Sequence, residues 1–241
     1  MKLLLTGGAG RLGRALRMLL PDLIAPPRDE LDLTMPETVR NALVSYHPQG
    51  VVHAAAYTDV VGAERDRTLC WRTNVGGTRN LARLASELNV FVVHISTDYV
   101  FSGERGDYYE DDAPGPVRNY YALSKLAAEE IARMVPRHLV IRTSFRVAPW
   151  PYPVAYVDLH TSQEYLHVIA PEIALALTHL TDIPYDTLHI AGPRTSAYEL
   201  ARRTRPDVRA AFRAASEVEL PADVSLNTSR WRSLKHTWGN P

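Results

Sequence analysis

The 241-residue sequence has almost no cysteine and no excess of charge. A single cysteine, Cys70, excludes an internal disulfide framework and suits a reducing cytoplasm. No histidine or aspartate stands at catalytic spacing from it, so we interpret Cys70 as buried packing. The 27 basic and 27 acidic residues cancel. Because no charge excess attracts nucleic acid or an anionic membrane, we expect neither as a partner.

Metal motifs and long hydrophobic runs are also missing. The nine histidines form no ligand pattern such as HExxH, so we expect no metal site. No apolar run approaches the roughly 20 residues of a membrane span. The chain opens directly on a strand-like segment, which leaves no room for a signal peptide. We therefore expect a cytoplasmic protein, and a homodimer stays an open alternative.

Lysine is rare in this sequence, and one of the few lysines, Lys125, follows a tyrosine at helical spacing. Three of the 27 basic residues are lysines, and Lys125 lies in the stretch NYYALSKLAAEE, residues 119–130. Lysine is a point charge with a perturbable pKa, unlike arginine. Tyr121 precedes Lys125 by four residues, so the two side chains share a helix face. We expect the ammonium to lower the pKa of the phenol, which would make Tyr121 an acid. The alternative is a surface pair on an amphipathic helix.

Apolar strands alternate with periodic helices along the first part of the chain. Uniformly apolar strands indicate a parallel sheet that is covered on both faces. The pattern predicts an α/β fold, a Rossmann-type doubly wound parallel sheet. Thr34, Pro36 and Glu37 mark a capped helix start. We expect strands at 2–6, 22–26, 50–56, 90–97 and 138–144 and helices at 11–20, 34–46, 74–88 and 120–134.

The character of the sequence changes after Ser144. The next residues, 145–160, are rich in proline and aromatics and show no clear period, and the arginine-rich run 202–213 is interpreted as a solvated helix face. We expect a Rossmann body over 1–144 and a C-terminal part over 145–241. This second part would hold the last strands and a small, trimmed substrate lobe, interleaved with the body as effectively one domain. Its expected elements are helices at 170–180 and 196–204 and a strand at 187–192.

A glycine loop joins the first strand to the first helix. The segment TGGAGRLG, residues 6–13, has the spacing GxxGxxG. Glycines permit a tight turn and let the backbone approach a pyrophosphate, while the helix N-terminus supplies N–H donors. No GK[ST] follows, which disfavours a P-loop. The sequence therefore predicts a dinucleotide site at Gly7, Gly10, Arg11, Leu12 and Gly13.

The segment LIAPPRDELDL, residues 23–33, bears on the choice of cofactor. Prolines occupy the place where an acidic residue would hold the ribose diol of NAD, and Arg28 follows them. Because an arginine there can pair with a 2′-phosphate, we expect NADPH. Asp29 or Glu30 could reach the diol if the strand ends later, so NADH stays open. Asp32 and Leu33 would flank the adenine.

Five segments together resemble one known family. The sequences HAAAYTDV, NVGGTRNLA, VVHISTDYVFSG, NYYALSKLAAE and LVIRTS are similar to those of the dTDP-4-dehydrorhamnose reductases, a family of extended short-chain dehydrogenases/reductases. The resemblance is continuous over residues 1–144 and patchy after that, although PADVSLNTSRW, residues 221–231, is also similar. It implies NADPH-dependent reduction of the 4-keto group of a dTDP-4-dehydro-6-deoxy sugar, with a nucleotide sugar as substrate.

The resemblance assigns roles to individual residues. Tyr121 would protonate the carbonyl oxygen, Thr97 would hydrogen-bond that oxygen, and Lys125 would tune Tyr121 and bind the nicotinamide ribose. Asn74 matches a family asparagine or caps a helix. Ser96 supports Thr97 or satisfies the backbone. The cofactor and substrate cleft would be lined by Ala54, Ala55, Ala56, Tyr57 and Thr58.

Three departures from the family concern the substrate side. Val61 stands where the family has aspartate. Phe145 stands where the family has a tryptophan of the substrate pocket, and whether Trp150 compensates for that loss stays open. The segment before the helix at 170–180 is short. Two alternatives therefore stay open. One is another short-chain carbonyl reductase or an epimerase, and the other is a non-catalytic regulatory subunit that binds NADP or a nucleotide sugar.

Overall fold

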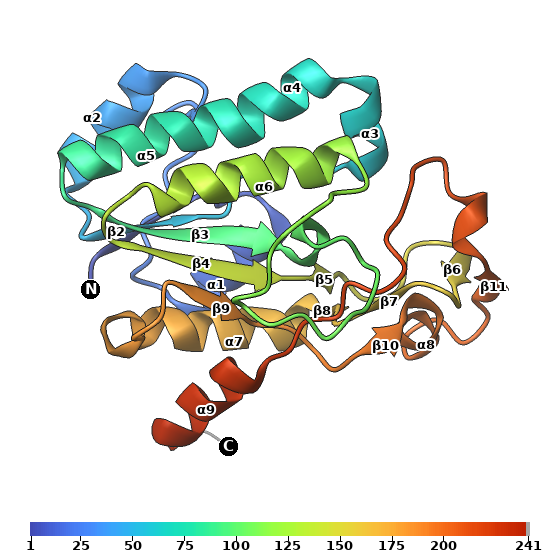
Figure 1. The fold of residues 1–241 in the computed structure, drawn as a ribbon. Coiled ribbons are helices and arrows are strands. Elements are labelled where there is room, and N and C mark those ends of the chain that lie inside the picture. The colour runs from blue at the N-terminus through green and yellow to red at the C-terminus, as the bar shows by residue number, and fades with distance from the viewer. Residues whose placement is uncertain (240–241) are drawn as a thin grey trace.

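A parallel sheet of five strands forms the centre of the computed structural model, which describes residues 1–239 (Figure 1). All neighbouring strands are parallel. The sheet confirms the α/β, Rossmann-type architecture that the sequence predicts. In spatial order the strands are β1 (Leu3–Thr6), β2 (Gly50–His53), β3 (Phe91–Thr97), β4 (His138–Thr143) and β9 (Thr187–His189).

Helices cover both faces of this sheet. Leu5, Val52 and Val93 pack on one side against α1 (Arg11–Leu19), α7 (Leu166–Thr178) and α9 (Ser229–Thr237). Leu4, Val51 and Val92 pack on the other side. There they meet α2 (Pro36–Tyr46) and α5 (Gly77–Glu87), and α6 (Tyr120–Arg133) lies on the same side. Successive strand residues face opposite layers, which explains why the strands read as uninterrupted apolar runs.

The order of the strands creates a crevice at the end of β1. After α1 the chain passes one edge of β1, where Ile24 bridges Leu4, and then returns to form β2 on the other side of β1. This reversal is a topological switch point. In open parallel sheets, ligands bind outside the carboxyl ends of the strands at such points. The glycine loop of residues 6–13 lies there.

Several expected boundaries are wrong. Residues 22–26 form only one bridge rather than a strand, because Pro26 and Pro27 have no N–H to extend the pairing. Thr34 does not cap α2: Met35 is the N-cap, and the Thr34 hydroxyl donates to Asp32 instead. Helix α7 begins at Leu166 and includes Pro171, so packing overrides the expected start at 170. Strands β2 and β9 end three residues earlier than expected, and residues 72–76 before α5 are π-helical.

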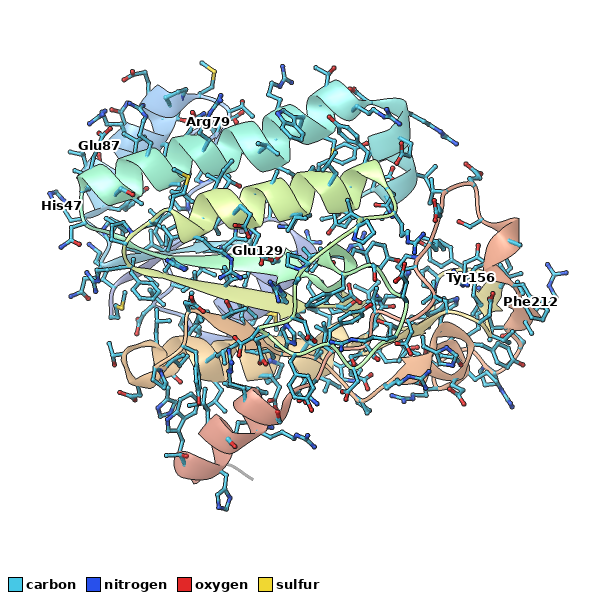
Figure 2. All side chains as sticks on the ribbon, in the orientation of Figure 1. His47, Arg79, Glu87, Glu129, Tyr156 and Phe212 are labelled. Carbon is cyan, nitrogen blue, oxygen red and sulfur yellow. The ribbon has the colours of Figure 1, made fainter. Side chains whose placement is uncertain are left out.

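The C-terminal lobe is built from short strand pairs around a small core of its own, which includes Trp150, Leu159 and Leu200. Tyr156 and Phe212 mark it in Figure 2. The expected helix face over 202–213 is wrong beyond Arg202, because the chain turns there into β11. The lobe's elements are β5 (Phe145–Arg146), β6 (Val154–Tyr156), β7 (His160–Thr161), β8 (Glu164–Tyr165), β10 (Thr195–Ser196), α8 (Ala197–Arg202) and β11 (Arg209–Ala211).

Two short helices, α3 (Val60–Arg65) and α4 (Arg67–Trp71), connect β2 to the π-helical turn before α5. Cys70 on α4 is buried, as expected, and its thiol donates to the Ser124 hydroxyl at 3.3 Å. Within residues 1–239, no helix combines the length and the hydropathy that a membrane crossing requires.

Candidate active site

The glycine loop is shaped by close backbone contacts. Gly7 has a φ of +76°, and a Cβ placed on it would lie 2.8 Å from the Cα of Ala55. A Cβ on Gly13 would collide with the carbonyl oxygen of Gly7, which also accepts from Gly10 N–H at 2.9 Å. Glycine is therefore required at Gly7 and Gly13 for the turn and for helix–strand packing.

The residues around this turn fit a dinucleotide. Helix α1 begins at Arg11 with Gly10 as N-cap, so the N–H groups of its first turn have no intrahelical acceptor and face the crevice end of β1. Leu12 is buried and anchors the helix, while Arg11 is exposed. Residues 54–56 follow β2 directly and lie against the loop, with Ala55 N–H donating to Thr6 Oγ1 at 3.2 Å.

The residues predicted to bind the adenosine end of the cofactor follow Ile24 in the chain. The Arg28 side chain is 80% exposed, and its Nε lies 3.4 Å from an Asp32 carboxylate oxygen. Asp32 also accepts from the Thr34 N–H and hydroxyl, both at 2.8 Å. Leu33 is buried against α2 and α5. Its main chain, rather than its side chain, is therefore left to contact an adenine.

Asn74 clamps the loop that follows β2. Its Oδ1 accepts from Tyr57 N–H at 2.7 Å, and its Nδ2 donates to the Tyr57 carbonyl oxygen and to Ser124 Oγ at 2.9 Å. The helix-cap alternative is wrong, because Asn74 lies inside the π-helical turn and not at a helix start. The clamp joins the candidate cofactor loop to α6, which carries Tyr121 and Lys125. Thr58, next to Tyr57, is exposed.

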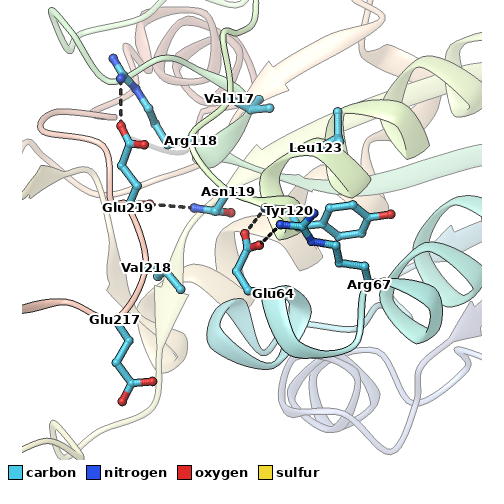
Figure 3. A pocket seen from close by; sticks show the side chains of 10 residues that line it. All are labelled: Glu64, Arg67, Val117, Arg118, Asn119, Tyr120, Leu123, Glu217, Val218 and Glu219. Atoms are coloured by element: carbon cyan, nitrogen blue, oxygen red, sulfur yellow. Dashed lines mark hydrogen bonds and ion pairs between the residues drawn. The ribbon is translucent and has the colours of Figure 1, made fainter.

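The start of α6 is fixed from two sides (Figure 3). Asn119 caps the helix by accepting from Ala122 N–H at 2.9 Å, and its amide donates to the carbonyl oxygen of Glu219. Glu64 on α3 accepts from Tyr120 N–H at 2.6 Å. These bonds hold the first turn of α6, and therefore Tyr121, in one position. The residues that make these bonds also line the hollow between α3, α6 and residues 217–219.

Thr97 and Tyr121 meet at the carboxyl end of β3. Thr97 is buried at the last position of that strand, and its hydroxyl lies within hydrogen-bonding reach of the Tyr121 phenol. The ring of Tyr99 packs edge-on to Tyr121, with centroids 6.3 Å apart. The expected lowering of the Tyr121 pKa is wrong for this arrangement. Burial raises the pKa of Tyr121, and the nearby carboxylate of Asp98 raises it further.

Lys125 lies one helical turn from Tyr121 and is buried, not on the surface as the alternative had it. Its Nζ donates to the Ile95 carbonyl oxygen at 2.7 Å and lies 3.4 Å from His94 Nε2. Burial lowers the pKa of Lys125 to about 8, although the Glu129 carboxylate opposes the shift. Burial also lowers the pKa of His53, whose ring lies 5.1 Å from that of His94, to about 3. The Lys125 ammonium therefore lies next to the neutral imidazole of His94, and the neutral ring of His53 packs behind it.

Asp98 and Thr161 belong to the site and were not predicted. Asp98 is buried and accepts from Thr97 Oγ1 and from Thr161 Oγ1, each at 3.0 Å. Burial raises the pKa of Asp98 to about 6 against these hydrogen bonds. The signal for Asp98 was its place directly after Thr97. Thr161 comes from β7 in the lobe, and no local pattern marks it. Ser96 points the other way and donates to Glu129 at 2.6 Å, so it does not support Thr97.

Two of the three departures, Val61 and Phe145, lie in different surroundings. Val61 is half-buried on α3. Phe145 on β5 packs against the hydrophobic core between the sheet and helices α1 and α7. Trp150 is 4% exposed, and its indole N–H donates to the Val154 carbonyl oxygen at 3.1 Å. Trp150 therefore forms part of the core of the lobe.

A glycine loop at the switch point, with a threonine at the end of β3 and a tyrosine and a lysine on the adjacent helix α6, defines a Rossmann-fold protein of the short-chain dehydrogenase/reductase type. The profile of the family described as "RmlD substrate binding domain" matches residues 1–170. The chain therefore belongs to this family, that of the dTDP-4-dehydrorhamnose reductases, as the motif resemblance indicates.

Individual relatives agree. The chain is 33% identical over 199 residues to the dTDP-4-dehydrorhamnose reductase of Aggregatibacter actinomycetemcomitans, covering 79% of this chain and 67% of that protein. It is 38% identical over 151 residues to a probable dTDP-4,6-dihydroxy-2-methyloxan-3-one 4-ketoreductase of Streptomyces antibioticus, covering 60% and 51%. The matches thus span between about half and two thirds of these relatives' lengths.

A solved structure extends the likeness over nearly the whole chain. The dTDP-4-dehydrorhamnose reductase from Bacillus anthracis, in complex with NADP, is 25% identical with a TM-score of 0.86. That alignment covers 97% of this chain and 93% of the other. The C-terminal lobe therefore follows the family fold as well, although the sequence resemblance is patchy there.

Proposed function

We propose that the protein uses NADPH to reduce the 4-keto group of a dTDP-4-dehydro-6-deoxy sugar, as in dTDP-L-rhamnose formation or a related pathway. The observation that carries the proposal is the pairing of Thr97 with Tyr121 at the end of β3, one turn from the buried Lys125. The glycine loop of β1 lies at the same edge of the sheet. The names of the curated relatives support the sugar and the reaction.

The chain's own residues supply a proton and hold the substrate oxygen. Bound NADPH would provide a hydride for the carbonyl carbon. Tyr121 then gives its hydroxyl proton to the carbonyl oxygen as negative charge develops there, and the product is an alcohol. Because its pKa is raised, the phenol keeps its proton until that moment. Thr97 donates to the same oxygen when its hydroxyl turns from Asp98.

Residues of the loop and of the segment after Ile24 would select the cofactor. Arg11, Leu12 and Gly13 at the start of α1 would offer backbone N–H groups to the pyrophosphate, Gly7 and Gly10 shape the turn beside it, and residues 54–57 would lie along it. Arg28 is exposed and free to move from Asp32 to a 2′-phosphate, which favours NADPH. Lys125 would reach the nicotinamide ribose by exchanging its bond to Ile95. NADH remains the alternative.

The other readings of the sequence make different predictions. An epimerase would retain its cofactor through purification, whereas a reductase exchanges it at every turnover. A binding subunit has no chemical need for a threonine, a tyrosine and a lysine at one strand end. We further propose a cytoplasmic location, which the single cysteine supports. A homodimer remains a prediction.

The test is NADPH oxidation on addition of dTDP-4-dehydro-6-deoxy-L-mannose. We expect turnover by the wild type and a loss of about 10²–10⁴-fold in Tyr121→Phe, the range for a positioned general acid. NADPH binding should persist in that variant. Tyr120→Phe changes the adjacent tyrosine, which packs on Trp71 and Arg67 at the surface, and should keep full activity. Full activity of Tyr121→Phe, or a wild type without turnover, would contradict the proposal.

A further inference from the structure

Arg146 is an arginine beside the site that has no acidic partner. It is half-buried on β5, and within residues 1–239 no Asp or Glu oxygen lies within 4.0 Å of its nitrogens. Two other arginines of the lobe are paired with carboxylates, Arg203 with Glu164 at 2.7 Å and Arg213 with Asp158 at 3.4 Å. A half-buried guanidinium without a counter-charge is a site for an anion from outside the chain.

Aromatic rings and one amide fix the position of this guanidinium. Its central carbon lies 4.7 Å from the ring centroid of Trp150 and 5.3 Å from that of Tyr152. Its Nε donates to Gln163 Oε1 at 2.7 Å. Among the residues described, no hydrogen bond engages its two terminal amino groups. The group is thus held in place with a free donor edge, which is the edge that grips a phosphate.

A chain of hydrogen bonds connects Arg146 to the residue that meets the substrate oxygen. Gln163 accepts from Arg146, and its own N–H donates to Thr161 Oγ1 at 3.0 Å. Thr161 Oγ1 donates to Asp98, and Asp98 also accepts from Thr97, each at 3.0 Å. The charge of Arg146 also lowers the pKa of Tyr99, against the dominant effect of burial. Arg146 therefore lies a few side chains from Thr97, on the side of the lobe.

We propose that Arg146 binds the diphosphate of the nucleotide-sugar substrate. This inference rests on the proposed function. In such a substrate the 4-keto carbon and the anomeric carbon lie at opposite ends of the sugar ring, so the diphosphate is one ring away from the carbonyl. With the carbonyl oxygen at Thr97 and Tyr121, a cation on the lobe side stands where that diphosphate must be neutralised. The hydrogen-bonded chain sets the spacing between the two ends.

The experiment is calorimetric titration of NADPH-loaded protein with dTDP and with thymidine. NADPH occupies the pyrophosphate site of the glycine loop, so the dTDP diphosphate reports the second site. Arg146→Met keeps the packing stem but removes the charge, and we expect it to weaken dTDP binding about 10–100-fold, the range for a charged hydrogen bond. Thymidine binding should not change. Arg146→Lys should fall between the two proteins, because it keeps the charge without the fork.

Arg137→Met is the matched control. Arg137 packs over an aromatic ring too, 5.7 Å from the Phe91 centroid, but it precedes β4 at the opposite end of the sheet. We expect this variant to bind dTDP as the wild type does. Should Arg146→Met fail to fold, the wild type still decides, since a dTDP affinity no higher than that for thymidine overturns the proposal. Equal dTDP affinity in the wild type and Arg146→Met overturns it as well.

The two proposals fail in different ways. Arg146-dependent dTDP binding without NADPH oxidation would keep the diphosphate site and reject the reaction or its sugar. NADPH oxidation with the same KM in Arg146→Met as in the wild type would keep the reaction and reject the diphosphate site.

Discussion

Ionisation of the buried Asp98 carboxyl destabilises the fold at neutral pH, and the hydrogen bonds from its neighbours only partly offset this effect. It is buried next to Thr97 and Thr161, and its pKa is raised from about 3.8 to about 6. The folded protein therefore binds this proton more tightly than the unfolded chain does. Protonation of Asp98 stabilises the fold below about pH 4, and that contribution is lost as the pH rises through about 6.

Asp98→Asn should therefore gain stability relative to the wild type as the pH rises. A shift of this size corresponds to ~2–3 kcal/mol in the difference between the two free energies of unfolding, compared at about pH 4 and about pH 7. Urea unfolding of both proteins at the two pH values measures it. A difference that is constant with pH would show that Asp98 titrates as an exposed aspartate does.

At the residue scale, helical spacing predicted correctly that Tyr121 and Lys125 are neighbours, but the predicted direction of the Tyr121 pKa shift was wrong. The i, i+4 spacing predicts that Tyr121 and Lys125 share a helix face, and both do lie on α6 one turn apart. Spacing contains no information on burial. The ammonium turned out to bind the Ile95 carbonyl oxygen, and the phenol is desolvated beside Asp98. Both facts depend on strand β3, far from α6 in the sequence.

The turn between β1 and α1 is where a single methyl group should matter most. Gly13→Ala places a Cβ against the Gly7 carbonyl oxygen and 2.8 Å from the Cα of Gly8, so the turn must open. We expect an overpacking cost of about 1–3 kcal/mol and at least about 10-fold weaker NADPH binding. Fluorescence titration and urea unfolding measure the two effects.

Gly76→Ala is the matched control for this prediction. A Cβ at Gly76 would have no heavy atom within 4 Å, and the residue is helical. It should leave NADPH affinity unchanged and add up to about 1 kcal/mol of stability, since alanine favours a helix. If Gly13→Ala bound NADPH as tightly as Gly76→Ala, the loop would not be the cofactor site.

A buried ion pair joins α6 to β4. Arg142 donates to both carboxylate oxygens of Glu129, at 2.7 Å for the shortest contact, and Ser96 on β3 donates to it as well. Burial opposes ionisation of Glu129, but the hydrogen bond and the charge of Arg142 outweigh it and hold its pKa below the usual value. Figure 2 shows Glu129 between the helix and the sheet and Glu87 at the outside.

Glu129→Gln should destabilise the protein by about 3–5 kcal/mol, because it leaves the Arg142 charge buried without a counter-charge. Glu87→Gln breaks an exposed pair with Arg40 of similar length, 2.8 Å, and should cost less than about 1 kcal/mol. Urea unfolding of the two variants gives the comparison. Equal costs would mean that solvent reaches Glu129 in solution.

At the element scale, periodicity predicts the strands and helices that pack on both sides of the sheet. It fails where the partner is distant in the sequence. Residues 145–146 are strand β5 only because β8 lies beside them, and β6 pairs with β11 more than 50 residues later. Two-residue strands carry no period of their own. The proline pair after Ile24 shows the converse, since an apolar run is no strand without N–H groups to pair.

The whole molecule joins a body that holds the cofactor loop to a lobe that reaches the reactive centre. The family resemblance and the fold class could be predicted because the strand–helix alternation and the motifs of residues 1–144 are local. The contact between Asp98 and Thr161 spans 63 residues, and the one between Arg65 and Glu217 spans 152. Such contacts form only when the lobe folds onto the body, so the substrate side of the site could not be predicted from the sequence.

Transfer of deuterium tests the central claim most directly, because it follows the hydride itself. The protein would be incubated with dTDP-4-dehydro-6-deoxy-L-mannose and NADPH deuterated at the transferred position of the nicotinamide, and the sugar would be analysed by NMR. The account predicts deuterium on C4 of the product, with none formed by Tyr121→Phe on the same time scale. A sugar that returns unlabelled, or labelled at a carbon other than C4, would contradict it.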